Sequence, residues 1–295
     1  MYKRQHQVVP VEHCPIADPR VLDTAVLHRE WLGVTAVDVI APAIGAPVVV
    51  PVPVDGEPAV VQERVDIGSW AGQFAVDARG FWQVHPGAAA TLLRRVLSEL
   101  APRPGDRVLD LYAGAGLFAV PLADAVGPTG AVTAIEGDAR AAGHARENGA
   151  GRGWLRVLTG RVAEHLVDGA AVDGTAAAGT VIDLVVLDPP RTGAGRVVMD
   201  AVCALRPRAL VYVACDPAAL ARDLSYAASA GYRLSGLAAY DLFPMTHHVE
   251  CVATLRPARA ADRLLGQAGD EIDRRSDDNR PEKVGQQGVE EHDPA

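Results

Sequence analysis

The chain of 295 residues has no apolar run of the roughly 18 residues that a membrane-spanning helix needs. It also lacks, at its start, the basic, apolar and small-residue pattern of a secretory signal. Its four cysteines, Cys14, Cys203, Cys215 and Cys251, lie far apart. This spacing excludes the close pairs of a zinc site and the density of a disulfide scaffold. We therefore expect a cytoplasmic protein with reduced thiols.

Positive charge is also scarce. The chain has 28 Lys and Arg against 37 Asp and Glu, which gives a net charge of -9 at pH 7. Residues 257–295 carry -4 of this, and the rest of the chain carries -5. A protein that coats nucleic acid is basic. Any RNA substrate would therefore have to be held by a local patch or by another domain.

The two ends of the chain differ from its middle. Residues 22–32 predict a short helix, and Val-rich pieces between residues 41 and 78, separated by Gly, Pro and Asp, predict antiparallel strands. We expect residues 1–82 to form a partial α+β lobe. Residues 257–295 are polar and charged with almost no aromatics, so we expect an acidic, disordered tail there.

Strand and helix signals alternate in residues 83–256. The predicted strands are 107–111, 131–135, 155–158, 181–187 and 209–214. Helical patterns cover 86–100 and begin at residues 117, 139, 195 and 218. Fully apolar strands that alternate with helices are typical of a parallel sheet covered on both faces. Two further strands, 233–240 and 249–255, predict an antiparallel edge hairpin. The expected fold class is α/β, a Rossmann-like sheet with helices on both faces.

The first strand of this region is followed by a glycine turn, in the sequence VLDLYAGAG. A nicotinamide-binding fingerprint needs a third glycine, where this chain has Ala119. An acidic residue at the strand end followed by Gly114 and Gly116 is instead similar to the first motif of Rossmann-like S-adenosylmethionine (SAM)-dependent methyltransferases. Glu136 ends the second strand, where a carboxylate binds ribose hydroxyls in either class. Taken alone, the Gly-x-Gly pair fits a tight turn without a ligand equally well.

Cys215 directly follows the apolar run 209–214 and precedes Asp216 and Pro217, which open a helix. Open α/β sheets place their reactive groups at such strand ends. The positive end of a helix lowers the pKa of a thiol and favours the nucleophilic thiolate. Cys215 is therefore a candidate nucleophile, although a lone cysteine at a strand end is more often a small core residue.

Two acidic residues are expected near this thiol. Asp188 ends the fourth strand in the sequence LDPPRTG, and Glu250 begins the last strand. A buried carboxylate beside a thiol and a cofactor pocket is a candidate general base, whereas Glu250 taken alone fits an exposed strand start. Asp-Pro-Pro is similar to the fourth motif of amino and base methyltransferases. Adenine-N6 enzymes follow it with an aromatic residue, where this chain has Arg191, and RNA cytosine-C5 enzymes carry a cysteine inside it.

Three segments, DPPRTG from Asp188, CDPAALARD from Cys215 and DLFPMTHHVE from Asp241, are together similar to the motifs of RNA uracil-C5 methyltransferases. That family forms 5-methyluridine in tRNA or 23S rRNA. The resemblance covers residues 83–256 and implies SAM as cofactor and RNA as substrate. It implies that Cys215 is the nucleophile and Glu250 the base. The positions that match the cofactor-binding residues of the family are Gln83, Tyr112, Glu136 and Asp188.

The chain departs from this family near its N-terminus. Members commonly carry an N-terminal RNA-binding barrel, and some bind a 4Fe–4S cluster through three close cysteines and a fourth. The sequence around Cys14 is similar to the surroundings of the fourth ligand, but the other three are missing. We therefore expect no metal cluster and interpret the chain as beginning inside a longer architecture. Leu117 also replaces a polar residue that some members have after the glycine turn.

Two other functions remain open at this point. The acidic balance and the missing barrel also fit a catalytically impaired SAM-binding remnant, although such a remnant has no physical reason to retain Cys215 and Glu250. A nicotinamide oxidoreductase is the third possibility, and it fails if only SAM raises the melting temperature. The sequence indicates neither the RNA and the uridine that are modified nor the oligomeric state.

Overall fold

The computed structural model describes residues 12–53, 56–167 and 181–258. The described residues up to Pro257 form one compact unit. The predicted acidic tail lies, apart from its first two residues, outside the described residues. Among the helices of the described part, none is long and apolar enough to cross a membrane.

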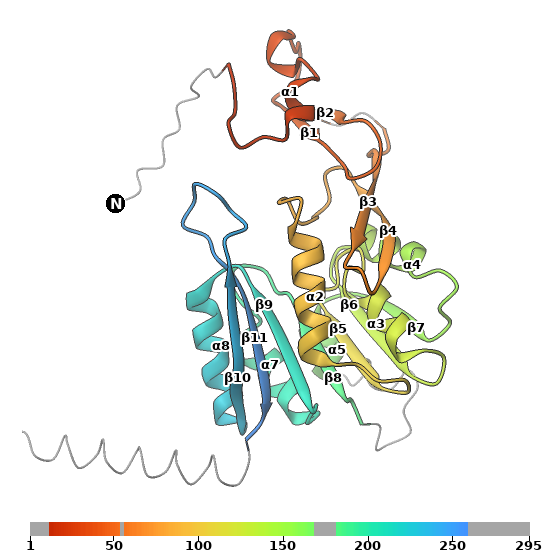
Figure 1. Ribbon diagram of the computed structural model, residues 1–295, viewed down its shortest axis with the longest axis vertical. Coiled ribbons are helices and arrows are strands. Elements are labelled where there is room, and N and C mark those ends of the chain that lie inside the picture. The colour runs from red at the N-terminus through yellow and green to blue at the C-terminus, as the bar shows by residue number, and fades with distance from the viewer. Residues whose placement is uncertain (1–11, 54–55, 168–180, 259–295) are drawn as a thin grey trace, which may run out of the picture. The chain divides into compact units, whose positions relative to one another are not determined.

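A seven-stranded sheet is the centre of residues 83–257 (Figure 1). Its strands are β5 (Arg107–Leu111), β6 (Ala131–Glu136), β7 (Leu155–Thr159), β8 (Leu184–Leu187), β9 (Ala209–Ala214), β10 (Tyr232–Tyr240) and β11 (Glu250–Pro257). Their order across the sheet is β10-β11-β9-β8-β5-β6-β7. Strands β5 to β9 are parallel, and β11 is antiparallel to both β9 and β10. The predicted α/β class and the edge hairpin are confirmed.

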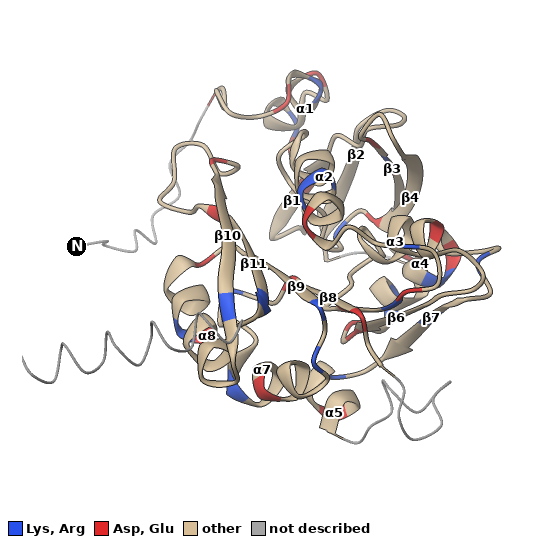
Figure 2. Ribbon diagram, turned by 60° about the horizontal axis from the view of Figure 1, so that its bottom comes forward, with Lys and Arg blue, Asp and Glu red and all other residues tan. Residues whose placement is uncertain are grey.

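Helices cover both faces of this sheet (Figure 2). On one side lie α2 (Ala88–Leu100), α3 (Ala119–Val126) and α4 (Ala139–Asn148), and on the other lie α5 (Val162–Val167), α7 (Gly195–Ala204) and α8 (Pro217–Ser229). Successive strand residues point to opposite faces. Val211 therefore joins the core under α2, whereas Tyr212 joins the core under α7 and α8. Burial on both faces explains why the central strands β8 and β9 are apolar throughout.

Two small antiparallel sheets precede this region, as the Val-rich pieces predict. The first pairs β1 (Ala36–Ile40) with β2 (Val48–Val52), and the second pairs β3 (Val60–Asp66) with β4 (Ala71–Asp77). A single bridge between Ile44 and Gln62 joins them. Phe74 of β4 is fully buried and shares a hydrophobic core with Leu92 of α2. The domain boundary at residue 83 stays a prediction.

The helix predicted for residues 22–32 is wrong. The chain instead forms one helical turn, α1 (Pro19–Leu22), and then a short 3-10 turn, η1 (Val26–His28). Ala25 between them is left-handed, with φ +53°, and this conformation ends a right-handed helix. Asp18 caps α1 by accepting from the Arg20 backbone N–H, and the Arg20 guanidinium donates to the Pro42 carbonyl at 2.7 Å. These contacts outweigh the helical pattern of the sequence.

Asp77 at the end of β4 connects the second small sheet to α4. Its carboxylate accepts from Arg140 at 2.9 Å and lies 3.1 Å from Nε2 of His144. The side chain is only 9% exposed. The Arg140 hydrogen bond is the main cause that lowers the pKa of Asp77 from 3.8 to about 2. The charged form of Asp77 therefore stabilises the contact between β4 and α4.

We expect Asp77→Asn to lower the free energy of unfolding by about 1–2 kcal/mol at pH 7. Because the folded-state pKa is depressed, this stabilisation is complete above pH 3.8 and is lost as the pH falls toward about 2. Urea unfolding of both proteins between pH 7 and pH 3 measures the difference, which should shrink as the pH falls. Asp38→Asn, in an exposed pair with Arg79, is the control and should change little. A difference independent of pH would contradict the assignment.

Candidate active site

A cavity of about 950 Å³ opens at the carboxyl ends of the parallel strands. It is lined by all six residues that the sequence singles out: Gln83, Tyr112, Glu136, Asp188, Cys215 and Glu250. They come from the segment before α2 and from the ends of β5, β6, β8, β9 and β11. Parallel strands end at one edge of a sheet, which brings together residues that are far apart in the sequence. The structure thus places these residues in one site, and their individual roles stay predictions.

The glycine turn after β5 is fixed by Glu136. One carboxylate oxygen of Glu136 accepts from the Gly114 backbone N–H at 2.7 Å, and the other accepts from the Asp138 N–H at 2.7 Å. Gly114 has φ +55°, and a Cβ built on it meets no atom within 4 Å. Because Gly114 lines the cavity, a side chain there would project into open space. The bare backbone and the carboxylate form a cradle that a cofactor can occupy.

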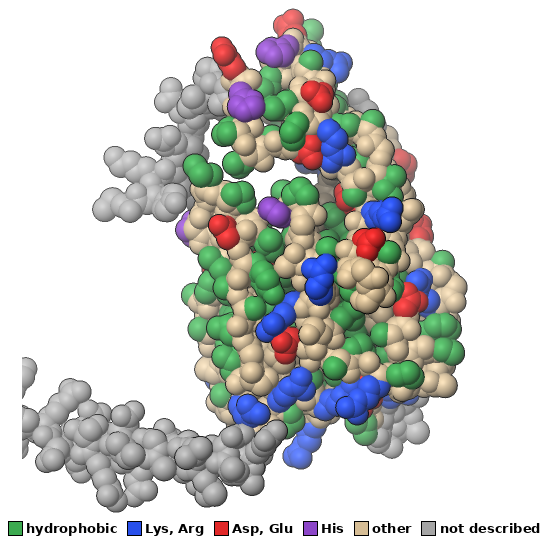
Figure 3. Space-filling view, viewed as in Figure 1, with side chains coloured by type: hydrophobic (Ala, Val, Ile, Leu, Met, Phe, Trp, Pro, Cys, Tyr) green, Lys and Arg blue, Asp and Glu red, His purple; other side chains and the backbone are tan. Residues whose placement is uncertain are grey.

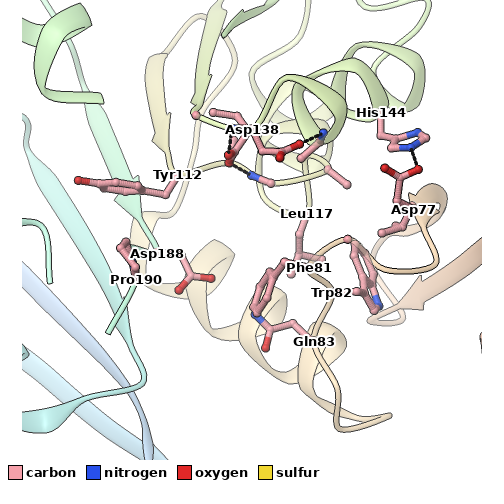
Figure 4. A pocket seen from close by; sticks show the side chains of 18 of the residues that line it. Asp77, Phe81, Trp82, Gln83, Tyr112, Leu117, Asp138, His144, Asp188 and Pro190 are labelled. Atoms are coloured by element: carbon pink, nitrogen blue, oxygen red, sulfur yellow. Dashed lines mark hydrogen bonds and ion pairs between the residues drawn. The ribbon is translucent and has the colours of Figure 1, made fainter. Parts of the chain in front are cut away.

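The opposite wall comes from the segment after β4 (Figure 4). Trp82 packs against the buried Phe74 with 5.3 Å between ring centroids, and this contact anchors the neighbouring Gln83 at the cavity. Phe81 is 71% exposed. Leu117 lines the wall on the glycine side. The cradle is therefore closed by apolar rings on one side and by polar groups on the other.

Strand register brings the thiol and the last carboxylate together. Ala214 of β9 pairs with Cys251 of β11 in antiparallel register. Cys215 directly follows Ala214, and Glu250 directly precedes Cys251. The same register therefore places Cys215 opposite Glu250 where the two strands meet the cavity. Asp188 follows β8, the other neighbour of β9. A nucleophile and two carboxyl groups consequently share one end of the cavity.

Both carboxyl groups are held in a poorly solvated place. Glu250 is 3% exposed, and burial raises its pKa to about 7. Burial also raises the pKa of Asp188 to about 8, and the nearby charge of Glu250 adds to this. A group with a pKa near 7 can take up and release a proton at neutral pH. These properties support Glu250 as a general base.

The lowered thiol pKa expected from the helix end is wrong. Burial raises the pKa of Cys215, and the charges of Glu250 and Asp188 raise it further. The helix end itself is occupied, because the Asp216 carboxylate accepts from the Ala219 N–H at 2.8 Å. Arg191 acts in the opposite direction and lowers the thiol pKa. Positive charge at this end of the cavity therefore favours the thiolate.

Several lining residues were not singled out from the sequence. Phe243 and His248 belong to the last motif, and their rings meet edge to face at 5.9 Å. The sequence contains them in the segment DLFPMTHHVE, but the sequence analysis assigned no role to the rings of that segment. Asp77, Arg140 and His144 also line the cavity. No sequence pattern predicts them, because Asp77 and Arg140 are 63 residues apart.

Comparisons with known proteins bear on this site. Residues 173–257 match the family model described as tRNA (uracil-5-)-methyltransferase. An uncharacterized RNA methyltransferase of Streptomyces avermitilis is 44% identical in an alignment that covers 86% of this chain and 63% of that protein. A 23S rRNA (uracil(1939)-C(5))-methyltransferase of Pseudomonas putida is 37% identical over 68% of this chain and 43% of its own length. The chain thus spans about three fifths or less of these relatives.

A solved structure gives a similar result. The tRNA (uracil-54, C5)-methyltransferase of Pyrococcus abyssi, in complex with S-adenosyl-L-homocysteine, matches with a TM-score of 0.53 and 26% identity. The match covers 70% of this chain and 46% of that one. The sequence comparison and the fold comparison therefore both find similarity to RNA uracil-C5 methyltransferases.

Proposed function

We propose that this chain is an RNA uracil-C5 methyltransferase, which transfers a methyl group from SAM to C5 of uridine in RNA, because its residues 173–257 match the family model described as tRNA (uracil-5-)-methyltransferase. The observation that carries the proposal is the single cavity in which Cys215 and Glu250 stand side by side near the glycine cradle. A nicotinamide oxidoreductase would need neither the thiol nor the base.

The cavity residues fit SAM as the cofactor. SAM supplies an electrophilic methyl group on a sulfonium. The Glu136 carboxylate, held by two backbone N–H groups, has lone pairs left for ribose hydroxyls. We propose that Gln83, Tyr112 and Asp188 complete the cofactor site. Asp188 in its ionised form offers negative charge to a cationic cofactor.

Cys215 provides the nucleophile that uracil chemistry requires. Carbon C5 of uracil reacts poorly with electrophiles. When the Cys215 Sγ bonds to C6, the C5–C6 π electrons move toward O4, and C5 becomes enolate-like and can take the methyl group. Glu250 then removes the proton from C5, the C5–C6 double bond re-forms and the Sγ–C6 bond breaks. The thiolate is regenerated, and the proton leaves on the Glu250 carboxyl.

Arg191 is suited to support the developing negative charge. It lines the cavity with Cys215 and lowers the thiol pKa by its charge. A fixed cation near O4 stabilises an enolate more than it stabilises uracil, and this difference accelerates the addition. We therefore assign Arg191 to the enolate oxygen.

The substrate is RNA, either rRNA or tRNA. The target base has to leave its stack to enter the cavity. On the face shown in Figure 3, Arg side chains are most frequent at the lower end, and others lie higher on the same face. Arg79, Arg140 and Arg191 also line the cavity itself.

Methyl transfer from labelled SAM to unmodified 23S rRNA and tRNA tests the proposal. We expect label at C5 of uridine in one of the two RNAs. RNA containing 5-fluorouridine should form a stable covalent complex, because fluorine cannot be removed as a proton. If SAM binds but neither label nor complex appears with either RNA, the chain is a silent SAM-binding remnant and the proposal fails.

A further inference from the structure

Asp223 is a buried carboxylate outside the cavity, and the mechanism above does not use it. Its side chain is completely buried. One oxygen accepts from the backbone N–H groups of Ala194 and Gly195, at 2.8 and 3.1 Å, and from the Tyr212 hydroxyl at 2.7 Å. The other accepts from the Arg222 guanidinium at 2.7 Å. These partners come from the start of α7, from β9 and from α8 itself.

The segment 192–195 is shaped around this carboxylate. Arg222 also donates to the Thr192 carbonyl at 2.8 Å. Gly193 has φ +77°, and a Cβ on it would stand 2.5 Å from the Arg222 side chain and 2.6 Å from the Asp223 side chain. The chain must therefore lack a side chain at position 193 to pass over the ion pair. Asp223 and Arg222 thus form the support on which this segment rests.

This support joins two parts of the proposed active site. Segment 192–195 is the direct continuation of Asp188 and Arg191, and Asp223 lies on α8, the helix that follows Cys215. Tyr212, which bonds to the same carboxylate, lies three residues before Cys215 on β9. Asp223 is six residues beyond Pro217, the first residue of α8, which is about 9 Å along the helix axis. It is too far from the thiol to act on the reacting atoms directly.

We propose that Asp223 is a positioning residue that holds the Asp188–Arg191 loop against α8, the helix that follows Cys215, and so keeps Arg191 beside the thiol. This inference rests on the proposed function, in which Arg191 supports the enolate. An asparagine at this position would turn its NH₂ group toward N–H and guanidinium donors, or leave some of them without an acceptor. Displacement of a catalytic group by about 1 Å can cost roughly 100-fold in rate.

A double-mutant cycle tests this proposal. Single-turnover methyl transfer is compared among wild type, Asp223→Asn, Arg191→Gln and the double variant. We expect Asp223→Asn to lower the rate by roughly 10- to 100-fold and to have almost no further effect when Arg191 is already glutamine, because it acts through that residue. SAM affinity should fall less than the rate, because Asp188 is the one proposed cofactor residue that lies in this loop. Multiplicative effects of the two substitutions, or a wild-type rate in Asp223→Asn, would overturn the proposal.

Asp106→Asn is the matched control. Asp106 is 8% exposed and accepts from Arg208 at 2.6 Å, but it lies before β5, at the end of the sheet away from the cavity. Its loss should lower the melting temperature without changing the rate. If Asp223→Asn does not fold, Tyr212→Phe removes one donor at nearly constant volume. Tyr212→Phe should lower the rate in the same direction, and again only when Arg191 is present.

A second readout does not depend on RNA. Alkylation of Cys215 by iodoacetamide, followed by peptide mass spectrometry, reports its thiolate fraction. Because the Arg191 charge lowers the thiol pKa, Asp223→Asn and Arg191→Gln should both slow alkylation at neutral pH, and Asp106→Asn should not. This result stands even if the wild type methylates no RNA, in which case only the proposed function fails. Unchanged alkylation in Asp223→Asn refutes the positioning role.

Discussion

Replacing Cys215 by alanine should lower kcat for methyl transfer to RNA by roughly 10⁴-fold or more. Without the sulfur, no bond forms at C6, and C5 remains too poor in electrons to take the methyl group. The variant retains all the residues that we assign to the cofactor site, so SAM should bind with unchanged affinity. Single-turnover labelling and a thermal shift with SAM measure the two quantities.

The control for this variant is Cys203→Ala. Cys203 is also buried, but it lies on α7 in the core on the far side from the cavity, and burial raises its pKa to about 11. The loss of this small apolar group should reduce stability slightly and leave the rate unchanged. A Cys215→Ala protein that retains more than a few per cent of the wild-type rate would exclude the covalent route.

The second large effect is expected from Glu250→Gln. Removal of a general base typically lowers the rate by about 10²- to 10⁴-fold. Here the slowed step should be proton removal from C5, which follows methyl transfer. The addition step should survive, because the charge of Glu250 is one of the causes that raise the pKa of Cys215. The methylated base should therefore stay bonded to Cys215, and a denaturing gel with labelled RNA should show this complex in the variant but not in wild type.

The pH profile gives the same assignment a second test. A base works only in its ionised form, so the wild-type rate should rise as the pH increases through about 7. The Asp188 and Glu250 carboxyls influence each other, and the observed value belongs to the pair. Glu63→Gln on β3 is the control, because burial also raises the pKa of Glu63 but it lies outside the cavity lining. Ionisation of the Cys215 thiol, whose pKa is raised by burial, gives a separate limb at higher pH. An unchanged limb near pH 7 in Glu250→Gln would refute the base.

Much of the fold follows from local patterns, and the differences have identifiable causes. The apolar runs of β8 and β9 are easily predicted because both faces of the sheet are covered there. The six residues of α5 escape prediction because they are too few to show a helical period. The helix predicted for residues 22–32 does not form. The Arg20 side chain just before it bonds to the carbonyl groups of residues 41 and 42, and the pattern of eleven neighbouring residues contains no information on such a contact.

The candidate site shows the same limit. Cys215, Glu250, Asp188 and Glu136 were found because each stands at a strand end, where chain order and sheet topology bring residues together. The thiol pKa was predicted in the wrong direction because its causes lie on two other strands, and helix polarity is only one local influence. Asp223 is part of the CDPAALARD motif. Its proposed positioning role, however, depends on Tyr212 and on the loop at Ala194, which lies 29 residues upstream.

The pairing of Ala214 with Cys251 means that backbone hydrogen bonds act as a ruler between nucleophile and base. Adjacent strands lie about 4.8 Å apart whatever side chains they carry. The separation of Cys215 from Glu250 is therefore insulated from changes in the surrounding core. A substitution in the core beneath these strands can therefore change the stability of the protein while the two reacting groups keep their distance.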